Sequence, residues 1–199
     1  FAKKDALAFN DFAHSSLGVP QYNIKLLMNK EADRLATLKA LRQWLPKVVD
    51  KNKTDLYVFF SGHGLASPDG KDLFLLPADG DPGLLEYSAL MRNEIFANIA
   101  KLNPKSVTVF LDTCYSGSTR SEEFMLAAKP IFIEVAEQEI PNNFTVFSAS
   151  ANNEIATILK EAEHGLFSYF LMKGLEGEAD SNSDQQITNG ELIAFINKK

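Results

Sequence analysis

Three short apolar runs constrain the fold of this 199-residue chain more than any other feature. Each run is apolar at nearly every position instead of at alternate positions, which is typical of strands that are covered on both faces. The runs are LYVFFS at 56–61, VTVFL at 107–111 and FTVFS at 144–148. Segments with helical spacing of apolar residues separate them, at 4–16, 32–49, 88–101, about 166–175 and from 190 onward. The sequence therefore predicts an α/β fold with a mostly parallel sheet and helices on both faces.

Composition excludes several classes of protein. The net charge is −6 and no basic run is present, which argues against a nucleic-acid partner or an anionic membrane surface. No apolar run reaches the roughly 18 residues that a membrane helix needs. A single cysteine, Cys114, excludes an internal disulfide framework and a Cys-rich zinc site. We therefore expect a cytoplasmic protein with neither a nucleic-acid nor a membrane partner.

A histidine and the cysteine each follow a predicted strand. His63 lies in SGHG after the first run, and Cys114 lies in DTCYSG after the second. Because parallel strands end at one edge of a sheet, we expect the imidazole and the thiol to share a crevice there. This pair is the minimum for nucleophilic cysteine catalysis, since the imidazole favours the thiolate. The backbone N–H groups of Gly64 and Cys114 are then candidates for an oxyanion hole.

Four segments carry a resemblance to a known family. They are FFSGHG at 59–64, DTCYSG at 112–117, FAKKDALAF at 1–9 and HGLFSYFLMKGLEGEAD at 164–180. The chain resembles the caspase-like cysteine peptidases, and it is nearer to the metacaspases and their bacterial relatives than to the animal caspases. The step of 51 residues from His63 to Cys114 also fits the family spacing of about 50 residues.

The resemblance implies a caspase-like three-layer fold and a cysteine endopeptidase that needs no cofactor for its chemistry. It implies one peptidase domain over residues 1–199. This domain would have a large-subunit-like part at 1–118, a linker at 119–143 and a small-subunit-like part at 144–199. The first core strand of the family would precede Phe1. We therefore expect the chain to associate with other domains or with a missing N-terminal segment of the same protein.

The resemblance also implies the substrate class. Asp112, Asp5 and Ser61 match the positions that line a pocket for Arg or Lys in metacaspases. Two carboxylates in a partly closed pocket favour a guanidinium or an ammonium group. We therefore expect protein or peptide substrates with a basic residue before the scissile bond. Relatives often cut themselves in the linker, which makes Arg120 and Lys129 candidate autocleavage sites.

The segment DSNSDQQITNGE at 180–191 has the spacing of a calcium-binding EF-hand loop. The oxygen-bearing residues at loop positions 1, 3, 5, 9 and 12 are Asp180, Asn182, Asp184, Thr188 and Glu191. Gln185 stands where an EF-hand has a glycine. The segment is also compatible with a solvated turn in which Thr188 caps the last helix. The candidate calcium ligands are thus Asp180, Asn182, Asp184 and Glu191.

Two other functions remain open from the residues alone. Cys114 and Arg120 have the C-x5-R spacing of a cysteine phosphatase. Against that, Thr113 stands where those enzymes usually have histidine, and the charge of Asp112 opposes a phosphate. The other alternative is a caspase-like interaction module without activity, although both dyad residues are present.

Overall fold

The computed structural model describes residues 1–67, 69–113, 140–149, 158–159 and 164–198. The chain divides into two units. We call residues 25–155 the central unit, and residues 1–24 together with 156–199 the terminal unit.

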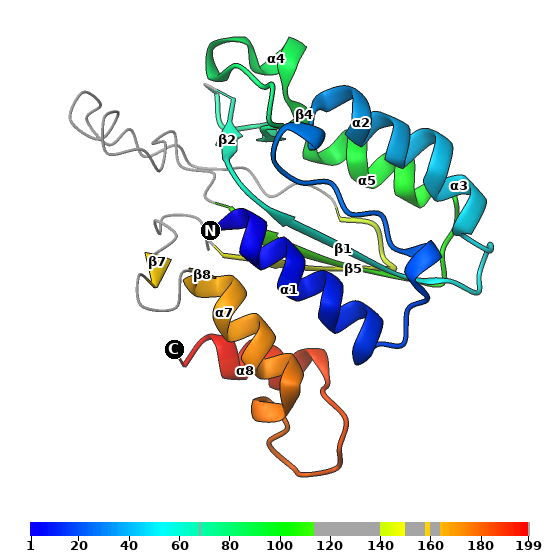
Figure 1. The fold of residues 1–199 in the computed structure, drawn as a ribbon, viewed down its shortest axis with the longest axis vertical. Helices are drawn as coiled ribbons and strands as arrows, with labels where there is room; N and C mark the ends of the chain where they lie inside the picture. The colour runs from blue at the N-terminus through cyan, green and yellow to red at the C-terminus, as the bar shows by residue number, and fades with distance from the viewer. Residues whose placement is uncertain (68, 114–139, 150–157, 160–163, 199) are drawn as a thin grey trace. The chain divides into compact units, whose positions relative to one another are not determined.

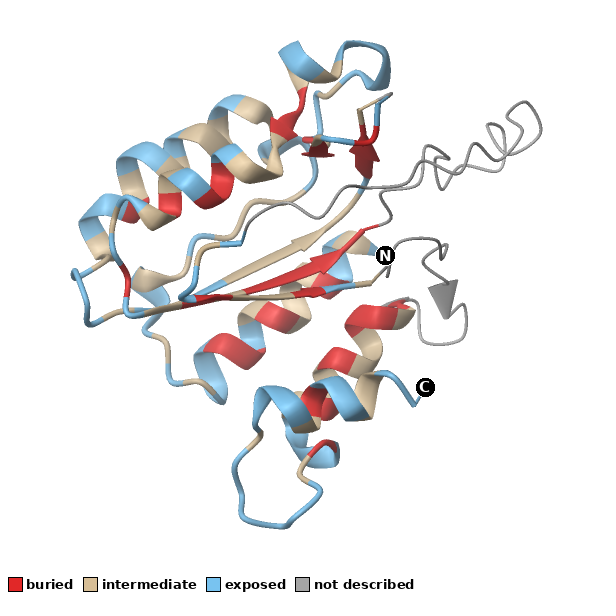
Figure 2. Cartoon of the chain, turned by 180° about the vertical axis from the view of Figure 1, so that it is seen from behind, coloured by how far each residue is buried: buried red, intermediate tan, exposed pale blue. Residues whose placement is uncertain are grey.

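The central unit contains a parallel sheet of three strands (Figure 1). The strands are β1 (Asp55–Ser61), β5 (Ser106–Asp112) and β6 (Phe144–Ser148), in the order β1-β5-β6. The three apolar runs are therefore confirmed as strands. The middle strand, β5, is the most deeply buried (Figure 2), and Val107, Val109 and Leu111 are each at most 1% exposed. Burial on this scale explains why the run is apolar at successive positions.

Helices of the central unit pack against this sheet. Two of them, α2 (Arg34–Lys39) and α3 (Leu45–Val48), flank a wider helical turn at Ala40–Trp44, and α5 (Arg92–Ala100) packs against that turn. The core joins Leu45, Ile95 and Ile99 of the helices to Val107 and Val109 of β5. Short 3₁₀ turns at Gln21–Asn23 and Asn29–Glu31 lie before α2. The α/β class, with a parallel sheet packed against helices, is confirmed.

The central unit also contains a second, smaller sheet, of which the sequence predicts one strand, through the short apolar run LFLL at 73–76. It is antiparallel and contains β2 (Gly64–Ala66), β3 (Leu73–Leu75) and β4 (Leu90–Met91) in that order. A 3₁₀ turn, η4 (Pro82–Leu84), and one helical turn, α4 (Leu85–Ser88), lie between β3 and β4. The Pro, Asp and Gly residues of the segment 65–70 indicate a loop, but β2 occupies the start of this segment.

The prediction of a helix over 88–101 is wrong at its start, although Ser88 has the residue type of a helix cap. That helix, α5, begins at Arg92, because Leu90 and Met91 pair with β3 first. The hydroxyl of Ser88 instead closes the preceding turn: it accepts a hydrogen bond from Asp81 N (2.8 Å) and donates to Leu84 O (2.9 Å). Strand pairing has therefore overridden a serine of the right type for a cap.

Among its described residues, the terminal unit contains the helices α1 (Ala2–Ser15), α7 (Leu166–Lys173) and α8 (Asn189–Ile196). The two-residue strands β7 (Ile158–Leu159) and β8 (His164–Gly165) are antiparallel, and a wide turn at Gly174–Glu178 follows α7. Helix α7 contacts both α1 and α8. A Cβ at Gly174 would come 2.7 Å from Leu192 Cδ1 of α8, so the close approach of the two elements favours glycine there.

The structure bears only in part on two further expectations, the linker and the absence of a membrane helix. The linker at 119–143 lies outside the described residues except for 140–143, and nothing tests the proposed large and small parts. Within the described ranges, no helix is both long enough and apolar enough to cross a membrane.

Candidate active site

His63 is held by main-chain hydrogen bonds at the junction of the two sheets. Gly62 N donates to Asp112 O at the end of β5 (3.2 Å), and Leu76 N donates to His63 O (2.9 Å). The chain thus leaves the parallel sheet at Gly62 and joins the antiparallel one at His63. The His63 side chain is exposed at this junction. A rigid backbone with an exposed imidazole is the arrangement that a general acid–base needs.

The register of the small sheet also sets the direction of Gly64 N–H. Residues 63 and 76 form a hydrogen-bonded pair, so Gly64 and Leu75 form a non-hydrogen-bonded pair. The N–H of Gly64 therefore points away from β3. This direction is compatible with its predicted place in an oxyanion hole.

Ser61 and Asp112 lie side by side at the carboxyl ends of two parallel strands, where they are register partners. Ser61 is half-buried, whereas Asp112 has no exposed surface. The structure therefore brings Ser61, His63 and Asp112 to one edge of the sheet. Asp5 is also buried, in the first turn of α1, but it belongs to the terminal unit. Its predicted place in the same pocket as the other three stays a prediction.

The remaining residues of the predicted peptidase chemistry lie outside the described residues. They are Cys114, with its backbone N–H, and the candidate cleavage sites Arg120 and Lys129. Cys114 follows Asp112 by two positions in the sequence.

Sequence reasoning missed Leu76, whose backbone N–H anchors the His63 carbonyl. No residue type signals this role, because the bond uses only main-chain atoms. Only the register of β2 and β3 would have revealed it, and the sequence indicates neither β2 nor its pairing with the apolar run at 73–76.

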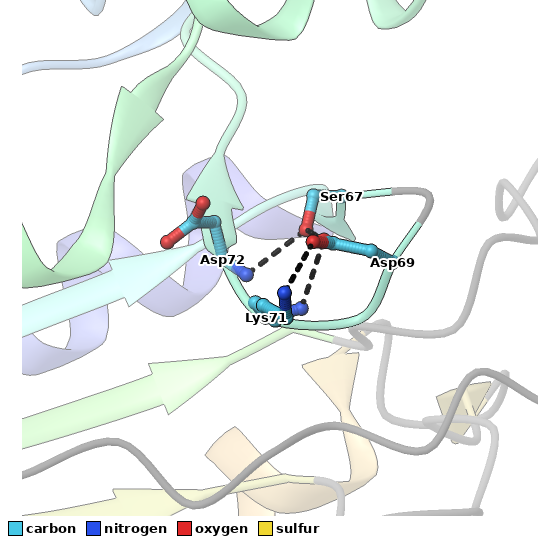
Figure 3. Close-up of polar contacts among 4 residues, drawn as sticks. All are labelled: Ser67, Asp69, Lys71 and Asp72. Carbon is cyan, nitrogen blue, oxygen red and sulfur yellow. Dashed lines mark hydrogen bonds and ion pairs between the residues drawn. The ribbon is translucent and has the colours of Figure 1, made fainter.

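The turn that joins β2 to β3 is closed by a polar network (Figure 3). Ser67 Oγ donates to Asp69 Oδ1 (2.7 Å), and Lys71 N donates to the same oxygen (3.2 Å). Ser67 Oγ also accepts from Asp72 N (2.9 Å). The Ser67 hydroxyl and the N–H of Lys71 lower the pKa of Asp69. These bonds fix the register of the hairpin that carries His63.

The segment 180–191 satisfies its carboxylates with its own donors. Asp180 accepts from the N–H groups of Asp184 (3.3 Å) and Gln185 (2.9 Å), and Asp184 accepts from Gln186 N (2.8 Å). Gln185 has φ +64°, so it takes the left-handed turn that glycine makes in an EF-hand. In the part of the chain that the structure describes, no group of three or more His, Cys, Asp or Glu is placed to hold a metal ion.

Glu191 and Thr188 form a capping box at the start of α8. Glu191 Oε2 accepts from Thr188 N (3.0 Å) and Thr188 Oγ1 (2.9 Å), while Oε1 accepts from Ser181 Oγ (2.9 Å). These bonds, with Thr188 contributing most, lower the pKa of Glu191 to about 2. The predicted cap at Thr188 is confirmed, and calcium binding at this segment stays a prediction.

The fold and the described residues first define a class: an α/β protein with an exposed histidine at the carboxyl edge of a parallel sheet, beside the strand that leads to its single cysteine. The model of the caspase domain family matches residues 2–199, and the chain therefore belongs to that family. Members of this family are typically cysteine peptidases. No curated protein sequence matches the chain significantly.

Proposed function

We propose that the chain is a cysteine endopeptidase that cleaves after Arg or Lys, with Cys114 as nucleophile and His63 as general acid–base. The observation that carries this proposal is the parallel register that pairs Ser61 with Asp112. His63 and Cys114 each lie two positions beyond these partners in the sequence. Because only Thr113 separates Cys114 from Asp112, chain connectivity supports a thiol near the edge where His63 is exposed.

In the proposed mechanism the Cys114 thiolate attacks the scissile carbonyl and a C–S bond forms. The N–H groups of Gly64 and Cys114 stabilise the oxyanion. Protonated His63 donates a proton to the leaving amine as the C–N bond breaks, which leaves an acyl-enzyme. Neutral His63 then takes a proton from water, the hydroxide attacks the thioester, and the peptide acid leaves as the thiolate is restored.

Asp112 is proposed to select the basic residue, with Ser61 beside it and Asp5 as a second acid. A buried carboxylate attracts a guanidinium more strongly than an exposed one, because water screens the charges less. Arg can also make two parallel hydrogen bonds to one carboxylate. The proposal requires that a substrate side chain reach Asp112, which has no exposed surface in the structure described here.

A paired assay tests this function. The protein and Cys114→Ala would be given reporter peptides with Arg, Lys or Asp before the reporter, and an aryl phosphate, each with and without calcium. We expect cleavage after Arg and Lys that depends on Cys114, and no phosphate release. Phosphate release without peptide cleavage would favour the C-x5-R alternative. If neither reaction occurred, the interaction module would be favoured.

Autoprocessing at Arg120 or Lys129 is a further part of the proposal. We expect active protein to show two fragments that join at one of these residues, and Cys114→Ala to stay intact. Intact-mass spectrometry distinguishes the two. Identical masses for the active and inactive proteins would contradict autoprocessing.

Calcium binding at 180–191 is tested separately from activity. Titration calorimetry with calcium would compare the protein with Glu191→Gln, which loses the carboxylate at loop position 12. Binding heat that disappears in the variant would support the site. Equal heats in both proteins would assign calcium elsewhere, and no heat in either would leave the segment as a capped turn.

A further inference from the structure

The η4–α4 surface exposes two large apolar side chains in the central unit. Tyr87 is 76% exposed and Leu84 is 54% exposed. Both come from the turns between β3 and β4, where most residues from Asp81 to Tyr87 are exposed. Exposed apolar side chains that are close in space often mark an interaction site.

The same segment is acidic. Residues 77–89 contain Asp79, Asp81 and Glu86 and no Lys, Arg or His. Arg34 contacts the segment from α2: its backbone N–H donates to Asp79 Oδ1 (2.8 Å), and its guanidinium Nε donates to Ala89 O (3.4 Å). Three carboxylates against one guanidinium leave a net charge of −2. A complementary partner would therefore be basic as well as apolar.

The surface is attached to the sheet that holds His63. Strand β2 begins directly after His63, β3 pairs with β2 and β4 with β3, and α4 contacts β4 (Figure 1). Leu76, which is hydrogen-bonded to His63, is eight residues before Leu84. Eight residues span at most about 28 Å. An extended polypeptide of about ten residues is thus long enough to reach from the imidazole to this surface.

We infer that the η4–α4 surface binds the substrate outside the scissile bond, and that its ligand is a polypeptide segment with a large apolar residue next to Lys or Arg. The inference rests on the proposed peptidase function and extends its basic preference beyond the residue that is cleaved. Tyr87 and Leu84 provide the apolar contact, and Asp81 and Glu86 attract the flanking cation.

The test compares long and short substrates. The long peptide has about 24 residues, one central Arg and a Leu-Lys pair about ten residues to either side of it. The short one is a tripeptide-Arg reporter. We expect Tyr87→Ala with Leu84→Ala to lower kcat/KM at the central Arg about tenfold, through KM, and to leave the short reporter unchanged. Tyr22→Ala is the matched control, because Tyr22 is 79% exposed in the terminal unit. It should change neither reaction.

A binding measurement separates this inference from the proposed function. Anisotropy of the labelled long peptide on Cys114→Ala protein needs no turnover, and we expect about tenfold weaker binding after the Tyr87 and Leu84 changes. Equal binding would overturn the inference even if the peptidase activity is real. A rise in short-reporter activity in the variant would overturn the inference, because it would mean that another part of the same chain occupies the surface. A loss of self-association in sedimentation would also overturn it, because it would mean that the surface binds a second copy of the chain.

Discussion

Two polar regions of the chain, the edge of the central sheet around His63 and the segment 180–191, are held in different ways. At the sheet edge, main-chain bonds such as Gly62 N to Asp112 O span about 50 residues of sequence. In the segment 180–191, the bonds run from carboxylates to N–H and hydroxyl groups at most ten residues away. The first arrangement fixes the backbone, and the His63 side chain is exposed. The second uses the side chains themselves to build the turn.

This difference has a functional consequence. A side chain that stabilises its own turn must give up those bonds before it can bind a ligand, and that exchange reduces the net affinity. At the sheet edge, the backbone is held by main-chain bonds, which a change of side chain does not remove. Substitutions at the sheet edge should therefore change activity more than stability, and those at 180–191 should do the reverse.

The largest expected effect is that of His63→Ala. Loss of the general acid–base should lower kcat/KM for an Arg reporter about 1,000-fold, while thermal unfolding changes little. His14→Ala is the matched control, because His14 is also exposed, on α1. Similar activity losses in both variants would contradict a specific role for His63.

Asp112→Asn should come next. The change keeps the shape of the side chain and removes its charge, so we expect roughly a 100-fold loss in kcat/KM for Arg. The informative quantity is the ratio of kcat/KM for a peptide with Arg to kcat/KM for the same peptide with citrulline, the neutral analogue of Arg. This ratio should fall toward one in Asp112→Asn. An unchanged ratio would remove Asp112 from the pocket, and the same measurement on Asp5→Asn would decide whether that acid belongs to it.

The Glu191 carboxylate should make stability depend on pH. Its pKa falls from the ordinary glutamate value of 4.5 to about 2 in the folded chain. A depressed pKa stabilises the fold above the unfolded value, and the effect is lost as the pH falls toward 2. Wild type should therefore be more stable than Glu191→Gln at pH 7, and the difference should shrink between pH 4.5 and 2. Urea unfolding at several pH values measures it, and a constant difference would contradict the capping box.

The smallest effect is expected at Gln185. A left-handed conformation destabilises a non-glycine residue by about 1–2 kcal/mol, and glycine avoids this strain. Glycine also raises the entropy of the unfolded chain, which offsets part of the gain in stability. Gln185→Gly should therefore stabilise the protein by about 0.5 kcal/mol. Gly177→Ala is the opposite control, because Gly177 has φ +124° and should lose stability. Destabilisation by Gln185→Gly would show that the Gln185 side chain stabilises the fold by more than its left-handed backbone destabilises it.

The sequence could predict the parts of the fold that depend on long apolar runs. Strands β1, β5 and β6 are apolar at successive positions, so their pattern is visible without the structure, although only β5 is buried along most of its length. Of the small sheet, the sequence could predict only β3, through its apolar run, because strands as short as Leu90–Met91 form only through pairing with a partner. The error at Ser88 has the same origin, since a serine looks like a cap wherever a helix is expected to start.

The candidate site could be predicted in part for a similar reason. Histidine and cysteine after two apolar strands indicate one edge of a sheet, and the register of Ser61 with Asp112 supports that interpretation. The role of Leu76 and the left-handed turn at Gln185 depend on backbone atoms alone, so the residue type at these positions does not indicate them. The relation of Asp5 to Asp112 depends on how the two units meet, which a linear pattern does not encode.

The central claim is that Cys114 and His63 form a catalytic pair, and the chain offers a direct test because Cys114 is its only cysteine. The rate of alkylation by iodoacetamide would be followed from about pH 4 to 10 in the wild type and in His63→Ala. The account predicts a reactive thiolate in the wild type with a pKa well below the usual value of about 8.5, and a return toward that value in the variant. Superimposable profiles for the two proteins would contradict the pair.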